Sequence, residues 1–124
     1  MTILIDSDVL IEVLRGRDAG ILEKWTGLAN SSDAVLCSPV SVAEIWHGAR
    51  PREHTAIAKL LGGLSCVPID AQTGQRAGVY LREYHKSHGV ELGDALIAAA
   101  AAQHRASLWT RNRKHYPMHG SWFY

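Results

Sequence analysis

Three carboxylates in this sequence stand where a strand or a loop gives way to a helix. Asp6 follows the short apolar run 2–5, and Glu44 lies near the start of a helix that follows a second apolar run. Asp94 directly precedes a run of alanines with helical character. In an open parallel sheet such junctions share the carboxyl edge, so we expect the three side chains to meet there. Neighbouring carboxylates repel one another and stay ionised at low cost when a cation lies among them.

The ligand types point to a particular cation and a particular chemistry. Carboxylate oxygens, with no Cys or His placed to replace them, favour Mg²⁺ or Mn²⁺ that keeps several of its waters. Such a centre suits the hydrolysis of phosphodiesters or phosphoesters, because the metal polarises a phosphoryl oxygen and orients a hydroxide nucleophile.

Each carboxylate also has a structural explanation. An Asp at the N-cap stabilises a helix by about 1 kcal/mol, and either Asp6 or Asp8 could cap the helix after the first strand. Glu44 completes an S-x-x-E pattern with Ser41, which is typical of a capping box. Asp94 is a common residue type at a helix start. One acid is enough to cap this helix, so the presence of both Asp6 and Asp8 favours a functional role for Asp6.

A basic segment follows the last expected strand and reaches the same edge of the sheet. Its sequence is Thr110-Arg111-Asn112-Arg113-Lys114-His115. Thr110 and Asn112 are suited to bond metal-bound waters or to orient a carboxylate. The three cationic side chains are expected to contact phosphate if an acidic metal centre lies beside them. A solvated surface loop is the alternative. His115 stands apart from the other histidines, which form no zinc pattern.

The order of elements predicts the fold that must position these residues. Strands are expected at 2–5, 34–37, 65–69 and 107–110, and helices at 9–15, 19–30, 41–49, 54–61, 71–86 and 94–103. Strands that alternate with helices favour a parallel sheet with right-handed crossovers and helices on both faces. We therefore predict one α/β domain over residues 1–124, a three-layer sandwich with four to five strands. The stretch 116–124 is ambiguous between a short edge strand and a loose tail.

Composition sets broad limits. A chain of 124 residues fits one domain that needs no disulfide or structural metal. A net charge of +1 neither favours nor excludes a nucleic-acid partner. Cys37 and Cys66 lie in apolar runs, so we expect buried, reduced thiols. The sequence shows neither a signal peptide nor an apolar run of membrane length, which predicts a cytoplasmic protein.

Four segments together resemble a PIN domain, and more narrowly the VapC toxins of bacterial toxin–antitoxin pairs. They are residues 3–11, 41–45, 93–98 and 108–116, and they occur in the family's order. The resemblance implies a five-stranded parallel sheet and an endoribonuclease that depends on Mg²⁺ or Mn²⁺. It also implies a homodimer, and a small VapB-type antitoxin whose C-terminal segment wraps the toxin and blocks the site. Which RNA is cut stays open.

The resemblance also assigns roles by position. Asp6, Glu44 and Asp94 match the family's first three acidic positions, with Asp6 and Asp94 as metal ligands and Glu44 placing the metal or its water. Ser7 matches the Thr or Ser beside the first acid. Many members have a fourth acid after the last core strand, where this chain offers Asn112 and His115. That departure argues against a second tightly bound metal.

Two alternative functions remain open. The run 5–9 also fits the D-x-D-x-[TV] opening of haloacid-dehalogenase-like phosphatases, in which Asp6 would be a nucleophile, but this leaves Glu44 without a role. The missing fourth acid favours a second alternative, a catalytically silent PIN-like module that binds RNA or a partner.

Overall fold

The first strand of the chain is a central strand of its sheet. The computed structural model describes residues 1–120 and 122–124. Its strands are β1 (Thr2–Ile5), β2 (Ala34–Cys37), β3 (Ser65–Cys66) and β4 (Ser107–Trp109). They form a parallel sheet in the order β3-β2-β1-β4. Because all four strands run in the same direction, their carboxyl ends lie at one edge, as the sequence predicted.

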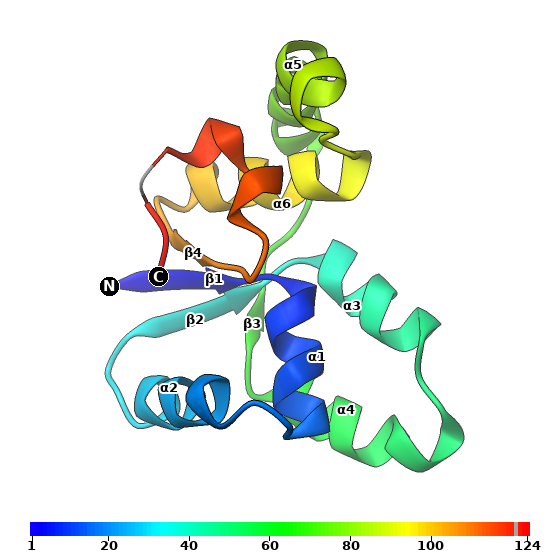
Figure 1. The fold of residues 1–124 in the computed structure, drawn as a ribbon, viewed down its shortest axis with the longest axis vertical. Coiled ribbons are helices and arrows are strands. Elements are labelled where there is room, and N and C mark those ends of the chain that lie inside the picture. The colour runs from blue at the N-terminus through cyan, green and yellow to red at the C-terminus, as the bar shows by residue number, and fades with distance from the viewer. Residues whose placement is uncertain (121) are drawn as a thin grey trace.

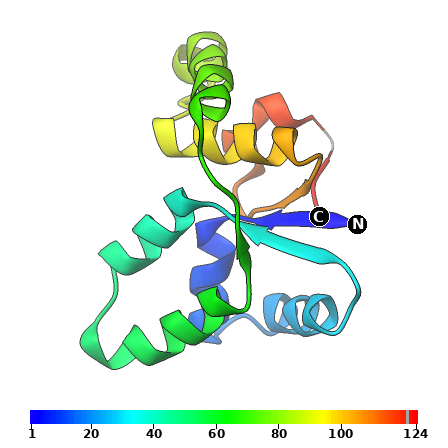
Figure 2. The same cartoon turned by 180° about the vertical axis from the view of Figure 1, so that it is seen from behind.

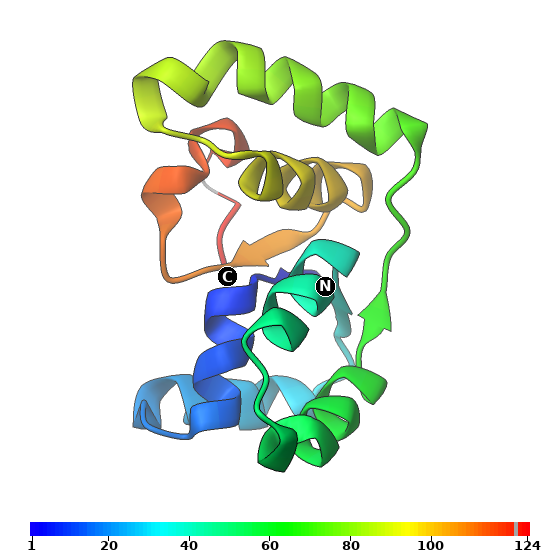
Figure 3. The same ribbon diagram turned by 90° about the vertical axis from the view of Figure 1, so that its right-hand side faces the viewer.

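Helices cover both faces of this sheet, which confirms the predicted three layers (Figures 1 and 3). On one side lie α1 (Ser7–Arg15), α2 (Ala19–Ala29), α3 (Pro39–His47) and α4 (His54–Gly62). On the other lie α5 (Ala71–His88) and α6 (Leu92–Gln103). Figure 2 shows the segment between β3 and α5 that carries the chain from the first side to the second.

The alternation of side chains along β1 explains how one short strand serves two cores. Ile3 and Ile5 pack with residues of α1, α2 and α4, whereas Leu4 packs with residues of α6. All three side chains are fully buried. Successive side chains of a strand point to opposite faces, so an unbroken apolar run is what a strand buried on both faces requires.

Small side chains let α5 and α6 pack closely. Ala95 and Ala99 of α6 form a buried cluster with Ala77 of α5 and with Val90 in the connection. A helix that is apolar nearly all round belongs in a core, as the sequence of α6 predicted. This packing holds the first turn of α6 rigidly beside the sheet.

Helix ends follow the expected chemistry. Asp18 accepts from the amide of Ile21 at 3.1 Å and caps α2, and Asp70 accepts from the amide of Thr73 at 2.9 Å and caps α5. Gly16 ends α1 with a φ of 66°. That left-handed conformation carries little cost for glycine, which has no Cβ.

The third strand differs from the prediction. It spans Ser65–Cys66 rather than 65–69, because Pro68 lacks the amide hydrogen that a longer ladder needs. Cys37 is buried as expected, and burial, with Cys66 alongside, raises the pKa of its thiol to about 12. Cys66 is exposed, so the prediction that both thiols are buried was wrong for this residue. The short strand β3 lies at the edge of the sheet and leaves that side chain uncovered.

The end of the chain pairs with the sheet. The amide of Leu108 donates to the carbonyl of Trp122, and the amide of Tyr124 donates to the carbonyl of Leu108, both at 2.9 Å. Phe123 thereby forms a single parallel bridge where a fifth strand was implied. Residue 121 of the ambiguous stretch lies outside the described residues. Among the helices that the structure describes, none combines the length and apolar character needed to cross a bilayer.

Candidate functional site

A polar pocket of about 150 Å³ lies at the carboxyl edge of the sheet, among the starts of α1 and α6, the second turn of α3 and the segment after β4. Its lining comprises Asp6, Ser7, Asp8, Glu44, Asp94, Asn112, His115 and Tyr116. The structure thus brings together the three carboxylates singled out in the sequence, which are up to 88 positions apart along the chain.

Asp6 is held by hydrogen bonds at both carboxylate oxygens. It is only 7% exposed. Its Oδ1 accepts from the amide of Ser7 at 2.8 Å, which makes Asp6 the N-cap of α1. Its Oδ2 accepts from the hydroxyls of Thr110 at 2.9 Å and Tyr116 at 2.8 Å. Donors from three parts of the chain therefore fix the plane of this carboxylate.

Asp8 points into the same pocket instead of capping the helix. The capping role that the sequence left open between Asp6 and Asp8 belongs to Asp6, because the helix begins at Ser7, two residues earlier than expected. The Oδ2 of Asp8 accepts from the amide of Arg111 at 3.1 Å, while the buried Oδ1 of Asp8 has no hydrogen-bond partner among the described residues. Burial, with the nearby charge of Asp6, raises the pKa of Asp8 to about 6.

Glu44 takes no part in a capping box. Helix α3 begins at Pro39, and Ser38 caps it by accepting from the amide of Ser41 at 3.3 Å. Proline is favoured at the first helical position, which explains why the helix begins earlier than the expected residue 41. Glu44 consequently lies in the second turn, and its Oε1 accepts from the hydroxyl of Ser7 at 2.9 Å. The explanation of Glu44 as the glutamate of a capping box is therefore wrong.

Asp94 combines a capping contact with a place in the pocket. Helix α6 begins at Leu92, and Asp94 Oδ2 accepts from the amide of Glu91 at 3.2 Å. The carboxylate is half-buried, and this burial raises its pKa. His115 Nδ1 lies 3.7 Å from the same oxygen, beyond hydrogen-bond distance, and 2.9 Å from the side-chain amide nitrogen of Asn112.

Sequence reasoning missed Tyr116, which falls in the stretch that was ambiguous. Its ring is buried in the core beside α6, and only its hydroxyl reaches the pocket. Burial raises the pKa of this hydroxyl, with the charge of Asp6 acting in the same direction, so it stays protonated and donates. No local pattern predicts the contact, because the turn after β4 determines where Tyr116 lies.

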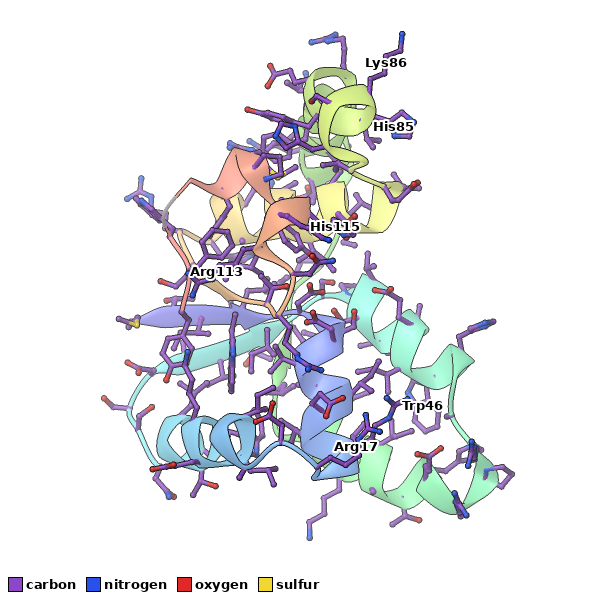
Figure 4. All side chains as sticks on the ribbon, viewed as in Figure 1. Arg17, Trp46, His85, Lys86, Arg113 and His115 are labelled. Carbon is purple, nitrogen blue, oxygen red and sulfur yellow. The ribbon has the colours of Figure 1, made fainter. Side chains whose placement is uncertain are left out.

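The three cations of the segment 111–114 point in different directions. The Arg111 guanidinium lies 3.2 Å from Glu12 on α1. The Arg113 guanidinium lies 4.9 Å from the centre of the Phe123 ring, and in Figure 4 it is well separated from His115. Lys114 is exposed. None of the three is among the described residues that line the pocket.

The pocket suits a hydrated divalent cation better than a dehydrated one. Within residues 1–120 and 122–124, no three His, Cys, Asp or Glu side chains are arranged as joint ligands of one ion. Mg²⁺ nevertheless binds to one or two carboxylates and keeps its remaining waters. The unpartnered Oδ1 of Asp8 and the half-buried carboxylate of Asp94 are the kind of oxygens that such an ion takes up. The residues therefore fit Mg²⁺ or Mn²⁺.

Known proteins share both the sequence pattern and the fold. A family model described as PIN domain matches residues 3–118. The chain is 39% identical over 117 residues to Ribonuclease VapC10 of Mycobacterium tuberculosis, covering 94% of this chain and 86% of that protein.

Solved structures agree with this likeness. A toxin-antitoxin complex from Klebsiella pneumoniae matches with a TM-score of 0.75 and 25% identity, covering 92% of this chain and 89% of that one. VapBC2 from Rickettsia felis bound to a promoter DNA fragment shares the fold, with a TM-score of 0.76 at 20% identity over 95% and 92% of the two chains. The resemblance of the four segments is thereby confirmed, and this chain belongs to the PIN-domain family, among proteins of the VapC type.

Proposed function

We propose that this protein is an endoribonuclease that depends on Mg²⁺ or Mn²⁺ and acts as the toxin of a VapB–VapC pair. The observation that carries the proposal is the meeting of Asp6, Glu44 and Asp94 around one polar pocket. The names of two relatives support it, since proteins 39% and 29% identical to this chain are called ribonucleases. We further propose that residues 1–124 act as one PIN-like unit.

The proposed roles follow from the contacts of each side chain. Asp6 and Asp94 would hold the cation, with Asp8 as an additional oxygen donor. When bound, the ion would polarise a phosphoryl oxygen and lower the pKa of a water. Glu44 would orient that water, and the Ser7 hydroxyl fixes the Glu44 carboxylate for this purpose. Attack of the water oxygen on phosphorus would break the bond to the 3′ oxygen, which would take up a proton released by the water, so the products would carry a 5′-phosphate and a 3′-hydroxyl.

The residues after β4 would support the centre in different ways. Thr110 orients Asp6 through a 2.9 Å hydrogen bond. Asn112 and His115 line the pocket at the place of the family's fourth acid, where they would bind waters of the ion or a phosphate oxygen. Arg111, Arg113 and Lys114 lie outside the pocket lining, so their proposed contacts are with RNA phosphates further along the strand.

A phosphatase mechanism fits these contacts poorly. With Asp6 as a nucleophile, Glu44 would have no role, yet Glu44 lines the same pocket and accepts from the Ser7 hydroxyl. A catalytically silent module that binds RNA or a partner is the second candidate. Asn112 favours this candidate, because it supplies no negative charge where many relatives have an acid.

Cleavage of single-stranded RNA in the presence of Mn²⁺ separates the two candidates. We expect Asp6→Asn and Asp94→Asn to abolish cleavage and Glu44→Gln to reduce it at least a hundredfold, the usual scale for a positioned acid–base group. Asp33→Asn is the matched control, because Asp33 pairs with the N-terminal amine at 3.2 Å, away from the pocket. Full activity of both Asp→Asn variants contradicts the metal assignment, and 2′,3′-cyclic phosphate ends contradict hydrolysis by activated water.

A VapB-type antitoxin and a second copy of this chain are the proposed partners. Structural neighbours described as VapBC or toxin–antitoxin complexes support the first. Co-expression with the VapB-type protein proposed as its antitoxin should yield a complex that no longer cuts RNA. Light scattering of the isolated protein should give the mass of a dimer, and a monomer at micromolar concentration contradicts that part of the proposal.

A further inference from the structure

Four arginines line a second pocket, of about 320 Å³, at the opposite end of α1 from the candidate site. Its lining comprises Arg15, Arg17, Gly48, Arg50, Arg52 and Glu53, and we refer to it as the arginine pocket. Arg15 is the last residue of α1 and Arg17 follows its cap, and the other residues come from the connection between α3 and α4. All four arginines are exposed, so their guanidinium groups are accessible from solvent.

The acids near the arginine pocket balance only part of this positive charge. Glu12 is buried and faces three guanidinium groups, at 2.9 Å from Arg17, 3.2 Å from Arg111 and 4.0 Å from Arg15. Glu53 accepts from the backbone amide of Arg50 at 2.9 Å. Five arginines against two glutamates give this region a formal charge of +3, in a chain whose total is +1. Such a local excess attracts a polyanion.

Packing holds the two sides of the arginine pocket in place. Gly16 ends α1 in the left-handed conformation and so sets the direction in which the chain continues to Arg17. The rings of Trp46 and His54 meet edge to face with 5.2 Å between their centres, which joins the end of α3 to the start of α4. In Figure 4, Arg17 and Trp46 lie at the same end of the molecule, opposite His85 and Lys86.

A small hollow shares lining residues with both the arginine pocket and the candidate site. It has a volume of about 70 Å³ between α1 and α3, and Arg15, Gly48 and Glu53 line both it and the arginine pocket. Glu44 lines both this hollow and the candidate site. Helix α1 rises about 12 Å from Ser7 to Arg15, at about 1.5 Å per residue. The arginines therefore lie a few nucleotides away from a phosphodiester bound beside Glu44.

We propose that the arginine pocket binds phosphate groups of the RNA strand on one side of the cleaved bond. This inference rests on the proposed function, because it takes RNA as the substrate. A strand that enters the candidate site carries a phosphate at every nucleotide, and Arg binds phosphate oxygens through two parallel hydrogen bonds. An acidic protein segment would also be attracted, but the spacing of about 12 Å along α1 between the arginine pocket and the candidate site favours the strand being cut.

The salt dependence of RNA binding tests this proposal directly. The variant is Arg50→Gln with Arg52→Gln, because neither side chain is an ion-pair partner of Glu12. The matched control is Arg82→Gln with Lys86→Gln, which removes the same charge from exposed positions of α5. All proteins carry Asp94→Asn so that the RNA stays intact, and thermal unfolding checks their fold. Fluorescence anisotropy with a labelled single-stranded RNA then gives the affinity at several salt concentrations.

We expect the Arg50/Arg52 variant to bind RNA roughly five- to tenfold more weakly than the control pair. The slope of log K against log salt should become shallower by about 1.4, at about 0.7 for each lost phosphate contact with a single strand. Arg50→Lys with Arg52→Lys should keep most of the slope, because the charges remain.

Other outcomes overturn the inference. Equal affinity and slope in the two Gln pairs would show that the arginine pocket does not contact RNA. Weaker binding of the antitoxin with unchanged RNA binding would assign the pocket to a protein partner. If RNA binding depends on Arg50 and Arg52 but the protein with Asp94 intact cuts no RNA, the proposed function fails while the binding inference stands. If the protein with Asp94 intact cuts RNA but the Arg50/Arg52 variant binds RNA as tightly as the Arg82/Lys86 control, only the binding inference fails.

Discussion

Replacing Tyr116 with Phe removes a single hydroxyl and leaves the ring in the core. The lost contact is the 2.8 Å hydrogen bond to Asp6 Oδ2, between a side chain that is 1% exposed and one that is 7% exposed. Hydrogen bonds to charged groups contribute about 1.5–3 kcal/mol. Thr110 still donates to the same oxygen, so we expect the lower part of that range, about 1.5–2 kcal/mol of unfolding free energy. For a chain of this size, that lowers Tm by about 5–8 °C.

Urea unfolding at pH 7, followed by circular dichroism, measures this loss. Tyr80→Phe is the control, because Tyr80 is half-buried against α6 and its replacement should change stability by less than about 0.5 kcal/mol. The Mn²⁺ concentration needed for half-maximal RNA cleavage should also rise severalfold in Tyr116→Phe, since Asp6 loses a group that orients it. A Tyr116→Phe protein as stable as the control refutes the reasoning that this hydroxyl fixes Asp6.

Three further predictions concern stability. Gly16→Ala should cost about 1–2 kcal/mol in chemical unfolding because its φ is 66°, whereas Gly27→Ala, inside α2 with open space around it, should be neutral or stabilising. Asp70→Ala should lower the free energy of unfolding by about 1 kcal/mol, because it removes the N-cap of α5. Chemical unfolding measures this loss, and an unchanged unfolding midpoint would contradict it. The hydrogen bond from Arg17, reinforced by nearby guanidinium charges, lowers the pKa of Glu12 below its usual 4.5. The ionised Glu12 carboxylate therefore stabilises the fold fully above pH 4.5, and this stabilisation is lost as the pH falls through the lowered pKa. Unfolding of Glu12→Gln should therefore differ most from the unsubstituted protein near neutral pH and converge with it in acid; a constant difference would contradict this.

Periodicity and topology made the fold predictable. Unbroken apolar runs identified β1 and β2, and strict alternation of strands with helices required parallel strands whose ends share one edge. That shared edge predicted that Asp6, Glu44 and Asp94 lie close together. Strand length was less predictable, because Pro68 removes a ladder bond at a point where side-chain pattern still favours a strand.

The finer structure of the site depended on where helices begin. The S-x-x-E pattern placed a helix start at Ser41, but Ser38 with Pro39 forms a better one, and that shift of two residues frees Glu44 for the pocket. Tyr116 could not be assigned a role from sequence, since its contact with Asp6 spans 110 positions and depends on tertiary packing.

The wide sequence separation of the contacts to Asp6 has a consequence for how the protein is made. Thr110 and Tyr116 lie 104 and 110 residues after Asp6, and β1 pairs with β4, the last strand of the sheet. During translation the amino-terminal part of a chain emerges first, and contacts with later residues must wait. A partly synthesised chain therefore has Asp6 without two of its donors and without one neighbouring strand. A chain that ends before residue 116 would therefore lack the Tyr116 hydroxyl that donates to Asp6, and this carboxylate would be less firmly oriented.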